Sequence, residues 1–335
     1  MFFSTVEATF LVEVQGILPV SVATDREKLW PFIEKAERKY ILPLLERELY
    51  DDLQKFCNDR PSWQSGSGGV SGEDTVMTTE LIRLIRIAEL NLAYCLGFDV
   101  LNVKISDAGF QRMGESAAFK GLYKYQEENL RKYFESTGYD GLDDMLKYIE
   151  DYIEYFPEWE DSTNYTARKI AIIKDAETFD AICFIGKSRL TFLRLQRYIN
   201  EIIDFEIKPL LGDEWPVLMI ELAKEDPADK YLALATEIRK PLAYLSCAKL
   251  IEKTGNLTDR GLFFEGKNSM FPDDSTKKPV EGDSALVAMQ SYISTGMKYI
   301  DALRKYLIDN LFTDHGSENG SVFDRDNTDK KTFVA

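Results

Sequence analysis

The stretch Tyr40–Glu48, YILPLLERE, has a diverged counterpart 166 residues later at Glu206–Glu214, EIKPLLGDE. Ile33 and Ile199 keep the same offset, so the match extends to residues before the motif. A recurring block of this kind indicates two copies of one folding unit. Proline cannot donate the next hydrogen bond of an α-helix. We therefore expect a long helix to stop before the proline in each copy, at the motif residues Pro43, Leu44, Leu45, Pro209, Leu210 and Leu211.

Three further blocks follow in the same order in both halves. Leu92–Tyr94 corresponds to Leu242–Tyr244 at an offset of 150, and Leu130–Tyr133 corresponds to Leu303–Tyr306 at 173. A Ser/Thr-Asp-x-Gly turn lies between them, in which glycine can take a positive φ. Each unit is expected to hold a first helix, a short second helix, a buried third helix, this turn and a final exposed helix. The turn residues are Asp107, Gly109, Asp259 and Gly261.

A helical period dominates the rest of the chain. Leu81, Ile85, Ala88 and Leu92 recur every three or four residues, which is typical of a helix deep in a bundle. The two-residue alternation that is typical of strands is nearly absent. The predicted fold class is all-α, with two tandem, diverged helical-bundle units that arose by internal duplication.

The domain organisation follows from where this periodicity breaks. We expect a first helical unit at residues 1–157, of which the first ~24 residues are less regular, and a second at 158–312. The segment Pro157–Thr166, PEWEDSTNYT, interrupts the pattern between them. Asp59–Thr78 and Phe264–Asp283 are poor in helix formers and are expected to be loops. The polar tail at 313–335 is expected to be disordered.

Composition limits the function. The 335 residues carry a formal net charge of −16, which disfavours nucleic-acid or anionic-membrane binding because both depend on clustered Lys and Arg. Neither a signal peptide nor an apolar run of about 18 to 20 residues is evident, so we expect a cytoplasmic protein. The four cysteines, which have no CxxC spacing, are interpreted as reduced core residues: Cys57, Cys95, Cys183 and Cys247.

Residues suited to catalysis are scarce. The one histidine, His315, lies in the polar tail, so histidine-based triads and metal sites lack a base or a ligand. Phe184–Ser188, FIGKS, is similar to the end of a phosphate-binding loop but lacks the glycine that would replace Ala181. Ser188 is better interpreted as the N-cap of a helix that begins at Arg189. We predict no catalytic, cofactor-binding or metal-ligating residue.

Half of the negative charge is concentrated in one segment. Asp140–Asp161 holds nine carboxylates against Lys147 alone. On an amphipathic helix over 141–156, such a run is ordinarily a solvated face. The alternatives are a surface that binds a partner or repels DNA. A dinuclear metal site in a helical bundle would also need histidine, which is missing here.

Tyrosines recur on the last helix of each unit and are candidates for a protein interface. Tyrosine gives a large contact area at a small entropy cost, which favours interface anchors. The alternative is that these residues pack against their own bundle. The candidates are Tyr123, Tyr125 and Tyr133 in the first unit and Tyr292, Tyr299 and Tyr306 in the second.

Long segments of both units carry a family resemblance. They include Ile82–Leu96, IRLIRIAELNLAYCL, in the first unit, and Thr166–Phe184, TARKIAIIKDAETFDAICF, with Ile207–Trp215, IKPLLGDEW, in the second. Over most of residues 25–310 the chain resembles a family of uncharacterised proteins encoded by gut bacteria of the Bacteroides group and by their prophages and phages. The shared motifs are packing and turn motifs, so no site residue carries over.

More remotely, a helical unit with a mid-bundle helix and an Asp-x-Gly turn resembles the head-tail connector (adaptor) proteins of tailed phages, which form rings beneath the portal. This resemblance implies a structural role and, for a phage-encoded protein, a place in the virion. Connectors of this type are single, shorter units, whereas this chain is a fused pair.

The expected function is therefore that of a structural or interaction protein, in particular a connector-like component of an oligomer. Its expected partners are further copies of itself or phage structural proteins, without sequence-specific nucleic acid, membrane or small-molecule substrate. Two alternatives stay open. One is an intracellular enzyme that uses carboxylates and a metal, and the other is a helical scaffold that binds a peptide in the groove between the repeats.

Overall fold

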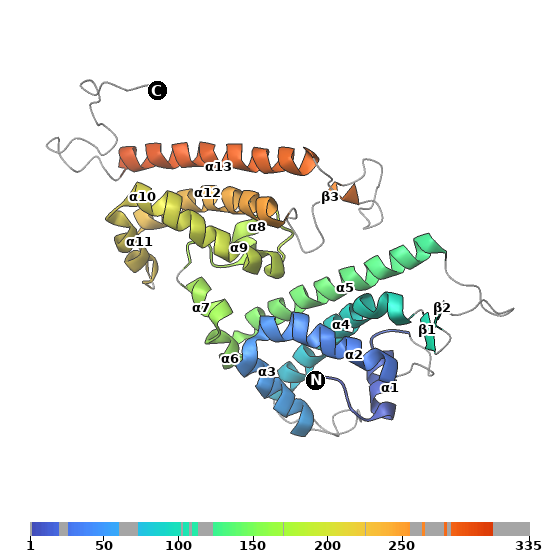
Figure 1. The fold of residues 1–335 in the computed structure, drawn as a ribbon. Helices are drawn as coiled ribbons and strands as arrows, with labels where there is room; N and C mark the ends of the chain where they lie inside the picture. Colours follow the sequence, from blue (N-terminus) through green and yellow to red (C-terminus); the bar gives the residue numbers. More distant parts are fainter. Residues whose placement is uncertain are drawn as a thin grey trace.

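The fold is taken from a computed structural model, and its helices fill nearly all of the described part of the chain (Figure 1). The all-α prediction is confirmed. Two short antiparallel hairpins are the exceptions: β1 (Val103–Ser106) pairs with β2 (Gly109–Arg112), and β3 (Phe263–Phe264) pairs with β4 (Lys278–Pro279). The described residues are 2–19, 26–59, 73–101, 103–106, 109–112, 123–169, 171–224, 226–254, 263–264, 278–279 and 283–310.

The helices form two packed units, which we call unit 1 and unit 2. Unit 1 contains α1 (Glu7–Gln15), α2 (Arg26–Ala36), η1 (Glu37–Ile41), α3 (Leu42–Asp59), α4 (Glu73–Leu101), α5 (Lys124–Asp151), η2 (Ile153–Tyr155), α6 (Pro157–Glu160) and α7 (Thr163–Lys169). Unit 2 contains α8 (Ala176–Asp180), α9 (Arg189–Ile202), η3 (Ile203–Ile207), α10 (Lys208–Leu211), α11 (Glu214–Leu222), α12 (Asp229–Thr254) and α13 (Asp283–Asn310).

Each unit has its own hydrophobic core. The core of unit 2 is built entirely from residues between Ile172 and Leu307. The core of unit 1 includes Trp159 of α6, so the segment that was expected to separate the units begins by packing against the first of them. α6 and α7 then lead from unit 1 into unit 2 (Figure 1).

The helix before each repeated proline does not stop there, so that prediction was wrong. Instead it widens into a single π-helical turn, η1 or η3, in which the N–H of Leu42 bonds to the carbonyl of Glu37 and that of Lys208 bonds to Ile203. A proline in an α-helix would clash with the carbonyl four residues earlier. The wider turn avoids this clash, and the helix continues through Pro43 or Pro209.

The chain changes direction three residues after each proline instead. Glu46 has φ 58° and ψ 174°, and the residue at the same place in unit 2, Gly212, has φ 54°. These values lie in a region that favours glycine. Glu46 adopts it although it carries a full side chain.

The long third helices, α4 and α12, match in burial, but at an offset of 153 residues and not the 150 expected from Leu92–Tyr94. At 153, the buried residues Leu81, Ile82 and Ile85 fall on Leu234, Ala235 and Ile238, which are also buried. Two arginines also coincide at this offset. Arg86 donates from Nε to the carbonyl of Phe2 at 2.7 Å, and Arg239 donates from Nε to the carbonyl of Ile172 at 2.8 Å.

The last helices, α5 and α13, match at an offset of 158 residues. A methyl group on Gly138 would lie 2.7 Å from Cγ of Leu92, and one on Gly296 would lie 2.5 Å from Cδ2 of Leu245. Both glycines therefore allow a close approach of the last helix to the third. Leu130–Tyr133 lies near the start of α5, whereas Leu303–Tyr306 lies near the end of α13, so these two blocks are not structural counterparts.

The first residues of the chain, expected to be less regular, begin unit 1 in the way that Ile172 and Ile173 begin unit 2. Phe2 and Phe3 are buried, as are those two isoleucines. A short helix follows in both units, α1 or α8, and each buries one phenylalanine: Phe10 in unit 1 and Phe179 in unit 2. The repeated order of features agrees with two diverged copies, whose origin by duplication stays a prediction.

Candidate functional site

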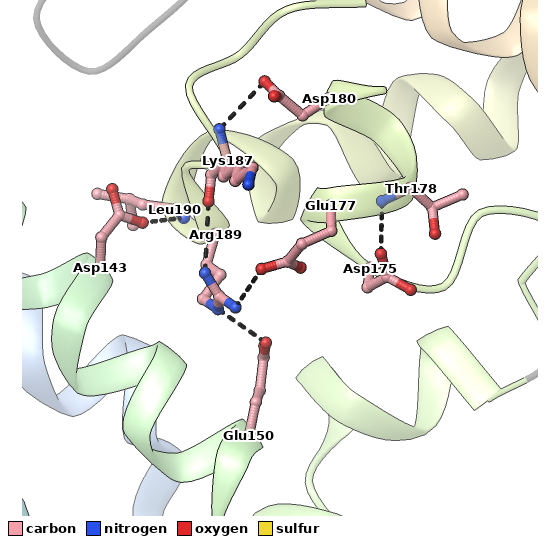
Figure 2. Close-up of polar contacts among 9 residues, drawn as sticks. All are labelled: Asp143, Glu150, Asp175, Glu177, Thr178, Asp180, Lys187, Arg189 and Leu190. Atoms are coloured by element: carbon pink, nitrogen blue, oxygen red, sulfur yellow. Dashed lines mark hydrogen bonds and ion pairs between the residues drawn. The ribbon is translucent and has the colours of Figure 1, made fainter. Parts of the chain in front are cut away.

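The most elaborate polar site among the described residues lies where α5 of unit 1 meets the start of α9 of unit 2 (Figure 2). Arg189 is almost completely buried there and bridges the two units. Its Nε lies 2.9 Å from Oε2 of Glu150 on α5, and its Nη2 lies 2.7 Å from Oε1 of Glu177 on α8. A guanidinium between two carboxylates is a strong and directional contact. Arg189 therefore fixes the orientation of α9 against α5.

Asp143 joins the same helices through the backbone. Its Oδ1 accepts the N–H of Leu190 at 2.9 Å, at the start of α9. The first amides of a helix have no partner inside it and carry partial positive charge, so a carboxylate stabilises them. Desolvation raises the pKa of Asp143, and the hydrogen bonds from Leu190, Ser188 and Arg189 oppose that rise. Ser188 accepts the N–H of Thr191 at 3.1 Å, which confirms the predicted N-cap.

The loop before α9 contains the FIGKS sequence, and its backbone amides already have an acceptor. Oδ1 of Asp180 accepts the N–H of Ile185 at 2.7 Å and that of Lys187 at 3.1 Å. Gly186 and Lys187 both have positive φ. The amide of Lys187 points at the Asp180 carboxylate (Figure 2). A phosphate that bound this loop would have to displace the Asp180 carboxylate. Together with the missing glycine, this contact argues against phosphate binding.

Apolar contacts complete the junction. Leu190 belongs to the core of unit 1, and Leu193 packs against that core. On α5, Leu146 is fully buried in the same core, and Tyr139 lies one turn before Asp143. Burial raises the pKa of Tyr139 to about 12, and the nearby charge of Arg194 on α9 opposes the rise. We call Tyr139, Asp143, Leu146 and Glu150 the junction stripe, since they follow one face of α5 at helical spacing.

A second polar contact fixes the linker. The carboxylate of Glu46 accepts the backbone N–H of Thr163 at 3.1 Å and that of Asn164 at 2.8 Å, at the start of α7. Glu46, whose φ is positive, thus caps a helix that begins more than one hundred residues later in the chain. Backbone strain of this kind persists where surrounding contacts impose it.

The acidic segment Asp140–Asp161 is divided between two environments. Asp143 and Glu150 bind unit 2, as described above, so part of the segment is an internal docking face. Glu158 is half-buried. The remaining carboxylates are exposed: Asp140, Asp144, Asp151, Glu154, Glu160 and Asp161. The solvated-face interpretation therefore fits these six and not the two junction residues.

The candidate interface tyrosines also divide. Tyr123, the N-cap of α5, is 67% exposed, and Tyr125 and Tyr133 on the helix are 60% and 52% exposed. The rings of Tyr123 and Tyr125 are stacked, with their centroids 5.9 Å apart. On α13, the three tyrosines pack against their own unit: Tyr292 and Tyr306 contact its core, and Tyr299 lies against the ring of Tyr244.

The repeated motif residues serve packing. Leu45 and Leu211 are buried, Leu44 and Leu210 are half-buried, and Pro43 and Pro209 are exposed. Gly109 begins β2 and pairs with Ser106. The remaining turn residues lie outside the described part of the chain: Asp107, Asp259 and Gly261.

One buried cluster in unit 1 was not foreseen from the sequence. Glu37 accepts hydrogen bonds from Tyr50 at 2.9 Å and from Gln54 at 3.2 Å. Glu89 is fully buried, and neither of its carboxyl oxygens has a hydrogen-bond partner among the described residues. Burial raises the pKa of Glu89 well above its ordinary value, and repulsion from Glu37 adds to the rise. Glu89 lies four residues after Ile85 and three before Leu92, and a glutamate at this spacing on the apolar face of α4 was the available signal.

The cysteines are free thiols, as expected from their spacing. The sulfur atoms of Cys183 and Cys247 lie 3.4 Å apart in the core of unit 2. The contact with Cys183, together with burial, raises the pKa of Cys247 well above the value of an exposed thiol. Within the described ranges, no group of three or more His, Cys, Asp or Glu side chains is arranged to hold a metal ion.

Residues 41–169 match a family of unknown function (DUF6712). The match covers less than half of the chain and extends from the end of η1 to the end of α7, within unit 1. No curated protein matches the chain. No solved structure matches it either. None of the described helices combines the length and the apolar character that a membrane span requires.

Proposed function

We propose that the protein is a structural protein that acts by binding other proteins, and that the exposed start of α5 is its partner-binding surface. The observation that carries this proposal is the exposure of Tyr123, Tyr125 and Tyr133. Tyrosine supplies a rigid, amphipathic contact area with only two side-chain torsions to order, so it is a frequent interface anchor. Stacking of two of the rings further reduces the freedom lost on binding.

The rest of α5 supports this assignment by holding that end of the helix in place. Its last turns are fixed between the core of unit 1 and the junction with unit 2, through Leu146, Asp143 and Glu150. The tyrosines therefore project from a helix anchored at its other end. A surface held in one position loses less entropy on binding than a loose one.

The partner proposed for this surface is a phage structural protein, because the chain resembles head-tail connectors. The charge supports the same role. Six exposed carboxylates of Asp140–Asp161 would repel DNA phosphates within a Debye length of about 8 to 10 Å, so that DNA could slide past without binding.

The test uses the portal protein encoded in the same genome as this chain. The wild-type protein should bind the portal and add density beneath it in negative-stain images. Combined substitution of Tyr123→Ser, Tyr125→Ser and Tyr133→Ser should weaken binding at least about tenfold, since an anchor residue is worth more than about 1 kcal/mol. The control is Phe184→Ser, because Phe184 is also an exposed aromatic residue, at 77%, but belongs to unit 2 and not to the proposed surface. Equal binding by the triple variant, or no binding by the wild type, contradicts the proposal.

A further inference from the structure

Two of the four cysteines meet in the core of unit 2, although they lie 64 residues apart in the chain. Cys183 belongs to the turn that leads from α8 to α9, and Cys247 lies within α12. Their Sγ atoms are 3.4 Å apart. A disulfide joins two sulfur atoms at about 2 Å, so the gap would have to close by about 1.4 Å. The fold thus brings two thiols from distant elements almost to bonding distance.

The shared packing pattern of the two units does not require cysteine at either position. Cys183 lies four residues after Phe179 of α8, and the residue four after Phe10 of α1 is Val14, which is also buried. At the offset of 153 residues, Cys247 falls on Tyr94 of α4. Unit 1 therefore fills the same two positions with a valine and a tyrosine, and the meeting of two thiols there is a feature of unit 2.

Tyr292 of α13 lies over this pair of thiols. Burial raises the pKa of Tyr292, and its interactions with Cys183 and Cys247 add to the rise. Tyr292 itself is half-buried, whereas the two cysteines are only 3% and 0% exposed. The tyrosine therefore extends from the surface of unit 2 toward the sulfur atoms. Burial of this degree keeps a thiol unreactive while the site is closed.

We propose that Cys183 and Cys247 are a redox-active pair that hydrogen peroxide converts into a reversible disulfide, and that Tyr292 covers the pair until its side chain moves aside. Partly exposed side chains change rotamer rapidly, so such openings recur in the folded protein. Disulfides that form in a reducing compartment are usually transient and redox-sensing. This inference does not rest on the proposed partner-binding function.

The chemistry needs one peroxide for each pair. One thiolate attacks a peroxide oxygen and becomes a sulfenic acid, and the hydroxide that leaves takes up the proton that this thiol lost. The second sulfur then attacks the first and displaces its hydroxyl group, which leaves as water with the second thiol proton. Two thiols and one peroxide thus give one disulfide and two waters, and the two electrons lost by the sulfur atoms reduce the peroxide. A dithiol reductant reverses the change by thiol–disulfide exchange.

The disulfide would tie the turn before α9 to α12. Arg189, which joins the two units, follows Cys183 by six residues. Closing a loop between residues 64 positions apart restricts the unfolded chain, so the oxidised protein should be the more stable form. Oxidation should therefore stabilise the segment that positions the junction arginine.

The test treats the folded, full-length protein with hydrogen peroxide and removes the excess. The protein is then unfolded without reductant, and the free thiols are alkylated before mass spectrometry. We expect each chain to lose the mass of two hydrogen atoms and to yield a linked peptide that contains Cys183 and Cys247, which dithiothreitol separates. The oxidised protein should also unfold at a higher urea concentration than the reduced protein.

Variants separate this pair from the other thiols. The double variant Cys57→Ser and Cys95→Ser, which removes the half-buried cysteines of unit 1, should keep the linked peptide, whereas Cys183→Ser should lose it. Tyr292→Ala should form the disulfide faster than the wild type, because it removes the cover. Circular dichroism establishes that each variant is folded.

The wild-type protein decides the inference without any variant. It is overturned if peroxide gives no peptide that links Cys183 to Cys247, or if the link forms only after the protein has been unfolded in urea. A Tyr292→Ala variant that is folded and oxidised no faster than the wild type contradicts the role of Tyr292 as the cover.

Discussion

Units 1 and 2 share their packing pattern and differ in what fills it. Where unit 1 buries Glu37 and Glu89, unit 2 buries Ile203 and Leu242. Glu37 accepts hydrogen bonds from Tyr50 and Gln54, whereas burial raises the pKa of Glu89, which favours its neutral form. Burying a polar group costs free energy unless it is hydrogen-bonded, and burying an unpaired charge costs far more. The comparison teaches that the positions of helices and glycines define the unit, and that its core chemistry can vary within that frame.

Leu242→Glu would break the comparison most severely. It places a carboxyl in the apolar core of unit 2, where Leu242 is completely buried. We expect a loss of about 4 kcal/mol or more in the free energy of unfolding, the range reached when a buried group is left unsatisfied. Urea denaturation measures it. A loss below about 1 kcal/mol would show that unit 2 accepts an acid as readily as unit 1 does.

Arg189→Ala tests the junction. It leaves Glu150, which is mostly buried, without its cation, so we expect a loss of about 3 kcal/mol. The matched control is Arg304→Ala, which removes the exposed ion pair with Asp301 on α13 and should change stability by at most about 0.5 kcal/mol. Thermal and urea unfolding of both variants give the difference. Equal losses would mean that the junction arginine contributes no more than a surface residue.

Glu89→Leu gives unit 1 the residue that unit 2 has at this position, Leu242. It should stabilise the protein by about 1 to 4 kcal/mol at neutral pH. The sign follows from the raised pKa of Glu89. Above about pH 4.3 the unfolded chain loses this proton while the folded chain keeps it, so wild-type stability falls as pH rises. The advantage of the variant should therefore grow between pH 4 and pH 7 in urea titrations. An advantage that is constant over this range would refute the protonated state.

Gly212→Ala has the smallest expected effect. A methyl group there meets no atom within 4 Å, so the substitution tests the backbone alone. With φ at 54°, alanine should cost about 1 to 2 kcal/mol. The counterpart change, Glu46→Gly, relieves strain but removes the cap of α7, and these effects should nearly cancel. If Gly212→Ala is neutral while Glu46→Gly is strongly stabilising, the equivalence of the two turns is wrong.

The sequence was sufficient for the helical class and for the first repeated block, because Pro-Leu-Leu fixes a register that no shifted alignment reproduces. It misplaced two other blocks for a physical reason. A shift of three residues along α12, or of fifteen along α13, returns to nearly the same side of a helix with 3.6 residues per turn. Apolar spacing alone therefore cannot distinguish the registers, whereas the glycine contacts of Gly138 and Gly296 can.

The junction could not be read from the sequence. Arg189 finds its carboxylates on two other helices, at Glu150 and Glu177, and Asp143 meets Leu190 across 47 positions. Nothing in the local pattern distinguishes these charges from solvated ones. Only the N-cap at Ser188, which depends on neighbours three residues away, was predictable.

The π-turns carry one consequence for how the chain tolerates change. Each holds one residue more than an α-helical turn would, which rotates everything downstream by about 100°. That rotation returns Leu45 and Leu211 to the side of the helix on which Ile33 and Ile199 are buried. At residues 38–39 and 204–205, whose side chains are exposed, the number of residues should therefore matter more than their identity. Removing one of these residues would turn Leu45 or Leu211 out into solvent. Exchanging one for a different polar residue would leave the core intact.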